Sequence, residues 1–217
     1  MKNPALPMLL FAATLVVACG NKHDASEENF AAAVNQYLDK HGDLCLTLLQ
    51  WPTDIPVEKI EVSKVMKRDS PAKYLDALVA AGLASESDIV VDQLRYDGKP
   101  NGHAYNVKRY VLSEIGRRYY REQSTSAVGG SPEVGDLCFG KAALDKIVKW
   151  DTPMNLRGPQ QEQVTYTYKI DNLAEWAMNP AVQKAYLGLQ YTIANAGKQQ
   201  KTHDLTLTNN GWEANGL

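Results

Sequence analysis

The tetrapeptide Gly-Asp-Leu-Cys occurs twice in this chain, at residues 42–45 and again at residues 135–138. Each copy opens a segment with a similar close, YVLSEIGR after the first copy and LTLTNNGW after the second. The distance from the cysteine to the closing glycine, Gly116 or Gly211, is nearly the same in both segments. Self-similarity at a fixed spacing indicates duplicated architecture. Little identity links the stretches between these anchors, so the alternative is two coincidental tetrapeptides in a chain rich in glycine and leucine.

The composition is that of a soluble globular protein. The chain has 217 residues, 44% of them hydrophobic and 22% charged, which is enough for one domain or two small ones. A net charge of −2 provides no global attraction for nucleic acid or for an anionic membrane surface. The three cysteines form no Cys-x-x-Cys pair and have no spacing with histidines that is typical of zinc ligands. We therefore expect no metal and no other cofactor.

The first residues have the features of an export signal. Lys2 precedes a short apolar run at residues 9–18, which is too short to cross a bilayer of about 30 Å as a helix. The run ends in Val16-Val17-Ala18-Cys19, which resembles the lipobox of bacterial lipoproteins. The resemblance implies cleavage before Cys19 and attachment of diacylglycerol to its sulfur, and several acyl chains anchor a protein durably. The alternative is an ordinary signal peptide that contains a cysteine.

The residues after Cys19 bear on the destination of such a lipoprotein. In that family an aspartate directly after the cysteine favours retention at the inner membrane, and here Gly20 and Asn21 follow instead. The resemblance therefore implies an outer-membrane lipoprotein that faces the periplasm. If Cys19 is acylated, Cys45 and Cys138 are each other's only intramolecular partners in an oxidising compartment, and a disulfide between them is expected. The alternative is two buried free cysteines that behave as small hydrophobic residues.

The chain then passes from a polar tether to its first regular elements. Residues 19–29 contain no large apolar side chain and read as a tether. A helix follows, because apolar residues recur at Phe30, Val34, Tyr37 and Leu38, and Gly42 is placed to end it. The apolar run at residues 44–51, stopped by Pro52, predicts a buried strand, with a short buried helix as the alternative.

Residues 57–121 contain a helix followed by a hairpin. Ser70 and Pro71 are an N-cap and a first-turn proline, and an apolar face runs from there to Gly82. A strand from Ile89 toward Tyr96, a turn cluster at 97–102 and a returning strand at 104–113 complete the stretch. This order, together with the LxxLVxxGL and YVLSxxGR segments, resembles winged-helix domains. The resemblance implies a winged-helix-like fold over about these 65 residues.

The hairpin also has a local basic excess. Seven basic residues and only two acidic ones lie between positions 95 and 121. Such a patch is typical of phosphate contacts in DNA binding. A lipid-anchored periplasmic domain meets no chromosomal DNA, so we expect no nucleic-acid partner. The two remaining interpretations are a solvated charged face and a contact surface for a protein or an anionic envelope polymer, whose candidate residues are Arg95, Lys99, Lys108, Arg109, Arg117 and Arg118.

The second half of the chain reads as an antiparallel sheet with one or two helices. Residues 123–134 form the best linker, and strands are predicted at 142–150, 163–170 and 205–208. Residues 173–186 predict a helix that restarts at Asn179-Pro180, whereas residues 189–194 fit either a strand or a helix. The fold class is therefore α+β. The predicted divisions are a signal peptide at 1–18, the tether at 19–29, a first subdomain at 30–122, the linker, and a second subdomain at 135–217.

A search for catalytic motifs gives none. The chain has no G-x-S-x-G elbow, H-E-x-x-H helix, P-loop or G-x-G-x-x-G turn. His203 stands beside Asp204, but neighbours in a strand point to opposite faces, so this pair is a poor catalytic signal. We expect a lipid-anchored envelope protein with a non-catalytic binding or scaffolding role. The alternative is an envelope hydrolase whose site is assembled from residues far apart in the sequence.

Overall fold

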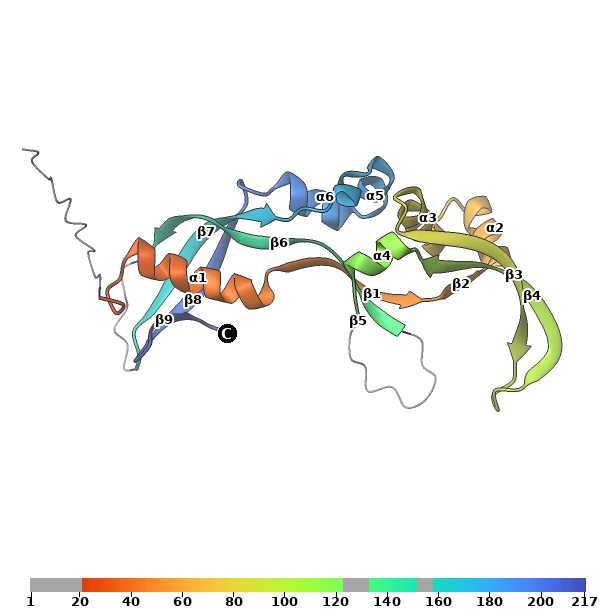
Figure 1. The fold of residues 1–217 in the computed structure, drawn as a ribbon, viewed down its shortest axis with the longest axis horizontal. Helices are drawn as coiled ribbons and strands as arrows, with labels where there is room; N and C mark the ends of the chain where they lie inside the picture. The colour runs from red at the N-terminus through yellow and green to blue at the C-terminus, as the bar shows by residue number, and fades with distance from the viewer. Residues whose placement is uncertain (1–20, 123–132, 152–157) are drawn as a thin grey trace, which may run out of the picture.

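The computed structural model describes residues 21–122, 133–151 and 158–217, so the predicted signal peptide, Cys19 and most of the predicted linker lie outside the described residues. The protein is a mixed α/β molecule with a curled antiparallel sheet and a second, smaller sheet (Figure 1). Its elements in order are α1 (Glu27–His41), β1 (Asp43–Trp51), β2 (Thr53–Pro56), α2 (Val57–Val65), α3 (Pro71–Ala80), β3 (Ala84–Leu94), β4 (Pro100–Leu112), α4 (Glu114–Tyr119), β5 (Tyr120–Glu122), β6 (Glu133–Trp150), β7 (Gln161–Asp171), the 3-10 helix η1 (Glu175–Met178), α5 (Pro180–Ala185), α6 (Leu187–Ala194), β8 (Gln200–Thr208) and β9 (Gly211–Ala214).

The larger sheet has the order β1-β6-β7-β8-β9, with β5 also paired to β6, and every pair in it is antiparallel. The smaller sheet has the order β2-β4-β3. Strand β6 runs for 18 residues, longer than the strand predicted at 142–150, because it also pairs with β1 and β5 at its beginning. Its register with β7 shifts on both sides of Lys146. These irregularities disturb the period of two on which strand prediction depends.

Helix α1 confirms the predicted first helix and its end at Gly42. The Ser26 hydroxyl accepts a hydrogen bond from the Asn29 amide at 3.3 Å, and the Gly42 amide donates to the Leu38 carbonyl at 2.8 Å. The helix begins at Glu27, inside the stretch predicted as a tether. Asp24 lies just before the helix, and its carbonyl accepts a hydrogen bond from the Trp212 indole at 3.1 Å. The last residues of the predicted tether therefore lie against the β8–β9 turn.

Helix α3 also begins as predicted, because Ser70 caps it and Pro71 occupies its first position. The helix predicted at 173–186 begins later, as η1, and restarts as α5 at the predicted Asn179-Pro180, where the Asn179 side chain accepts from the Ala181 amide. The open alternative at 189–194 resolves as helix α6. None of the helices in the described ranges is long and apolar enough to cross a membrane.

Two hydrophobic cores hold these elements together. One lies between α1 and the larger sheet, with Phe30, Val34, Val164 and Leu205 almost fully buried. The other joins the helix and hairpin stretch to elements from the second half of the chain. It contains Leu78, Leu83 and Tyr110 on one side and, on the other, side chains from β6, η1 and α5, namely Leu137, Phe139, Trp176 and Val182. Residues on both sides of the predicted linker thus share one core, and α1 packs on the sheet formed mainly by the second half.

Candidate functional site

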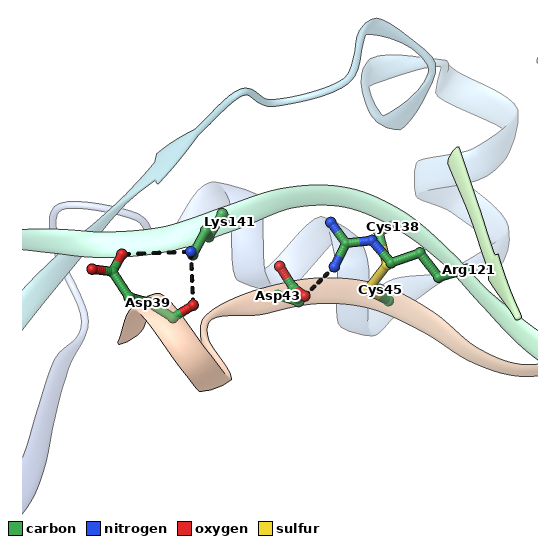
Figure 2. Close-up of polar contacts among 6 residues, drawn as sticks. All are labelled: Asp39, Asp43, Cys45, Arg121, Cys138 and Lys141. Atoms are coloured by element: carbon green, nitrogen blue, oxygen red, sulfur yellow. Dashed lines mark hydrogen bonds and ion pairs between the residues drawn. A yellow bond between two sulfur atoms is a disulfide. The ribbon is translucent and has the colours of Figure 1, made fainter. Parts of the chain in front are cut away.

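The two Gly-Asp-Leu-Cys segments lie side by side in the structure. Strands β1 and β6 pair antiparallel, and Cys45 stands directly opposite Cys138 in their register. Their sulfur atoms are joined in a disulfide (Figure 2). Cys138 is 8% exposed, and Cys45 is partly buried. The elements that follow the two segments differ, because β1 leads into β2 and α2 whereas β6 leads into β7. The duplication stays a prediction.

Two ion pairs lie near the disulfide, toward the end of β1 that adjoins α1 (Figure 2). The Arg121 guanidinium contacts the Asp43 carboxylate, and the Lys141 ammonium donates to the Asp39 carbonyl at 2.8 Å and lies 3.5 Å from its carboxylate. A cavity of about 280 Å³ opens beside them, lined by these cations together with Arg118, Tyr119 and Asn172. Two of the three cations that line the cavity, Arg121 and Lys141, already have carboxylate partners. Their ion pairs join β5 to β1 and β6 to α1. We assign this arrangement a structural role.

The six predicted contact residues fall into three separate groups. Arg95 and Lys99 flank the turn between β3 and β4. Lys108 and Arg109 lie in β4, nine and ten positions after Lys99, and Arg117 and Arg118 are in α4. At about 3.3 Å per residue, the span from Lys99 to Lys108 is roughly 30 Å. The structure therefore does not gather them into one patch.

The basic excess counted along the sequence is also offset in space. Lys108 pairs with Glu86 at 3.0 Å, and the hydrogen bond between them raises the pKa of Lys108. Arg109 makes a bidentate pair with Asp54, with nitrogen–oxygen distances of 2.7 and 2.6 Å. Strand β3, which faces β4, carries Glu86, Asp88 and Asp92. The carboxylates of the neighbouring strands thus offset the positive charge of β4.

His203 and Asp204 do not hydrogen-bond to each other. The His203 imidazole donates from Nε2 to the Asn215 carbonyl at 2.8 Å, whereas the Asp204 carboxylate accepts from the Gln163 amide at 3.0 Å. These two side chains therefore have different partners, as their neighbouring places in a strand predicted. Within residues 21–122, 133–151 and 158–217, no group of three or more His, Cys, Asp or Glu side chains is placed to hold a metal ion.

The most prominent surface feature is one that charge counting missed. Beyond Val107, where pairing with β2 ends, β3 and β4 continue as a two-stranded ribbon of residues 90–106, which we call the arm. Figure 1 shows the arm curving away from the rest of the molecule. Apolar side chains on it are open to solvent: Val90 is 66% exposed, Leu94 60%, and Tyr96 fully exposed at its tip. The sequence did contain an indication of this surface, because the apolar residues Val90, Leu94 and Tyr96 all lie in the predicted hairpin.

A buried carboxyl group that no pattern in the sequence indicated lies on the core-facing side of β7. Glu162 is 3% exposed, and neither of its carboxyl oxygens has a hydrogen-bond partner within the described part of the chain. Desolvation raises the pKa of Glu162, and the negative charge of Asp151 adds to the effect. The folded state therefore favours the protonated form. Because the unfolded chain ionises at a lower pH, this residue reduces stability as the pH rises above the unfolded pKa.

Replacing Glu162 with glutamine should accordingly stabilise the protein more at pH 8 than at pH 4. We expect a gain in the free energy of unfolding of about 1 kcal/mol at pH 8 and a smaller gain at pH 4, where this carboxyl is mostly protonated in the unfolded chain as well. Urea denaturation across this pH range measures the difference, with the exposed Glu122→Gln as the matched control. A gain that is the same at both pH values would show that the fold does not raise the pKa of Glu162.

Comparison of the chain with models of protein families, with curated proteins and with solved structures finds no match.

Proposed function

We propose that this protein is a lipid-anchored protein of the bacterial outer membrane, facing the periplasm, whose globular body binds another envelope protein without catalysing a reaction. The arm is the single observation that carries the binding role. The lipobox resemblance at residues 16–19 supports the anchor and the location. The helix α3 followed by the β3–β4 hairpin supports a winged-helix-like unit for the stretch that includes the arm.

Apolar exposure on a protruding ribbon supports a protein partner. A two-stranded ribbon has only marginal stability in water, and exposed apolar side chains on it do not contribute to the core. Both edges of the arm are open, because β3 is an edge strand and β2 pairs with β4 only at residues 107–110. Open edges accept strands from other chains, and exposed aromatic side chains fit apolar pockets. Such a surface favours a protein over an anionic polymer, since Arg95 and Lys99 are balanced within the arm by Asp92 and Asp97.

The anchor has a direct test. Replacing Cys19 with serine should abolish incorporation of labelled palmitate and move the protein from the membrane fraction to the soluble fraction, because the acyl chains supply the membrane affinity. Fractionation of labelled cells measures both effects. A wild-type protein that takes up no palmitate would contradict the lipoprotein interpretation.

Site-specific cross-linking tests the arm. A photoreactive amino acid at Tyr105, which is 44% exposed in the arm, should give one discrete adduct in living cells. The same group at Val148, similarly exposed on β6, should give none of that adduct. In the Tyr105 background, Leu94→Ser with Tyr96→Ser should reduce the adduct about tenfold or more, because exposed anchors at interfaces carry much of the binding energy. The melting temperature should change little, since neither side chain is buried.

The outcome that contradicts the proposal is specific. If the Tyr105 and Val148 adducts are the same, or if the Leu94→Ser/Tyr96→Ser variant cross-links as strongly as its parent, then the arm is not the contact surface.

A further inference from the structure

Helix α6 is unusually apolar for an element at the surface. Its sequence, LGLQYTIA, contains no charged residue. Only Leu189 is buried, whereas Leu187 is 67% exposed and Tyr191 57% exposed one turn later. A short surface helix normally covers the core with one face and shows polar residues on the other. The exposed apolar face of α6 therefore needs an explanation beyond packing of the core.

Two adjoining cavities lie along α6. The larger, of about 370 Å³, is lined from α6 by Gly188, Leu189 and Thr192, and the smaller, of about 200 Å³, by Tyr191 and Thr192. They share Leu44 as well as Thr192, and we call the pair the α6 groove. Leu44 packs against both hydrophobic cores, so the groove follows the seam where the two cores meet without merging. The remaining lining is mostly aromatic or aliphatic, including Phe139, Ala142, Tyr166 and Tyr168.

The α6 groove has one positive and one negative side chain, and each lines a different cavity. Lys201 is the one charged residue among those that line the smaller cavity, and it makes no ion pair within the described residues. Asp43 is the one charged residue among those that line the larger cavity, and its carboxylate is already engaged by Arg121. An elongated apolar ligand with one anionic end would therefore be attracted at the Lys201 end and not at the Asp43 end.

We infer that the α6 groove binds a free single-chain fatty acid, with its alkyl chain along the seam and its carboxylate at Lys201. Ligand sites in proteins are apolar clefts with a few polar groups that fix orientation, and the combined size of the two cavities is in the usual range. Exclusion of water from the alkyl chain supplies the affinity. The hydroxyl of Tyr168 donates to the Thr192 carbonyl at 2.9 Å, which holds α6 over the sheet and keeps the groove preformed.

The test uses the chain from residue 19 onward with Cys19→Ser, because both cores are built from residues 30–214. Calorimetric titration with sodium octanoate, decanoate and dodecanoate, below the concentrations at which they form micelles, should show saturable binding. The affinity should rise with chain length by up to about fourfold per methylene, the ratio that corresponds to about 0.8 kcal/mol per buried methylene. A series with no length dependence, or no saturable binding, overturns the inference.

Three substitutions separate the apolar and charged contributions. Thr192→Phe fills the wall shared by the two cavities and should weaken dodecanoate and the uncharged dodecanol alike, by tenfold or more. Lys201→Gln should weaken dodecanoate about threefold and leave dodecanol within twofold, because only the former presents a charge. Lys198→Gln is the matched control: its ammonium donates to the Ala194 carbonyl, it is not among the residues that line either cavity, and neither ligand should change.

Each remaining outcome has a defined meaning. If Thr192→Phe does not fold, Tyr191→Ser removes an exposed groove wall with little effect on the core and should lower both affinities. Dodecanoate binding that is unchanged in the Thr192→Phe or Tyr191→Ser variant, or equal losses for both ligands in Lys201→Gln, overturns the inference. Weaker binding by the acylated wild type than by Cys19→Ser would identify the protein's own lipid as the occupant instead of a free fatty acid.

Discussion

Replacing Cys45 and Cys138 together with alanine should lower the free energy of unfolding of the oxidised protein by about 4 kcal/mol. The bond closes a long loop, because the two cysteines are 93 residues apart in the sequence. In the chain-entropy account, a cross-link of this span removes much of the freedom of the unfolded chain and so stabilises the folded state. The position adds to the effect, since β1 connects α1, which packs in one core, to Trp51 and Ile55, which are buried in the other.

Urea denaturation of the exported protein measures this loss, and the wild type serves as its own control. Unfolding the wild type in the presence of a reductant should give a stability close to that of the Cys45→Ala/Cys138→Ala variant, because both lack the cross-link. The variant itself should be insensitive to reductant. The alternative of two buried free cysteines makes a different prediction: thiol titration of the denatured, unreduced protein would then find two free sulfhydryls at these positions.

The local signals in the sequence were sufficient for elements that carry their own caps. Ser26 and Gly42 mark the ends of α1, and Ser70 with Pro71 marks the start of α3, because capping hydrogen bonds involve only residues within a few positions. The alternation along residues 163–170 likewise predicted β7 within one or two residues. A period of two is visible there because Val164, Tyr166 and Tyr168 face the core shared with α1, whereas Thr165, Thr167 and Lys169 alternate with them on the other face.

The sharing of the cores was not predictable in the same way. Nothing near Leu78 or Tyr110 in the sequence indicates that Trp176 and Val182 complete their core, since the contact joins α3 and β4 to η1 and α5, which lie far away in the sequence. A count of charges along the sequence misses the neighbouring strands for a related reason. Residues 95–121 are basic when read along one stretch, but a hairpin places each strand beside another, and the acids of β3 lie upstream of that window. The register between neighbouring strands determines which charged side chains lie side by side on the surface. That register depends on the tertiary structure and is not visible in one stretch of sequence.

The glycines of the two Gly-Asp-Leu-Cys segments carry a constraint that the cysteines alone would not suggest, and we expect Gly42→Ala to destabilise the protein by about 2–3 kcal/mol. A β-carbon at Gly42 would lie well under 3.0 Å from the carbonyl oxygens of Leu38 and Ala142. Neither backbone can easily withdraw. The Gly42 amide donates to that same Leu38 carbonyl at 2.8 Å, and the Ala142 amide donates to the Gly42 carbonyl at 2.7 Å. Relieving the clash therefore breaks the end of α1 or its link to β6.

The second glycine should behave like the first, and a third provides the matched control. A β-carbon at Gly135 would collide with the Arg121 carbonyl and the ring of Tyr120, so Gly135→Ala should cost a similar amount. Gly188, within α6, has no heavy atom within 4 Å of an added β-carbon, and alanine there should stabilise by about 0.5–1 kcal/mol through helix propensity. Urea denaturation of the three variants should thus give two losses and one gain. If Gly42→Ala and Gly135→Ala match Gly188→Ala, close backbone approach is not the reason that both segments begin with glycine.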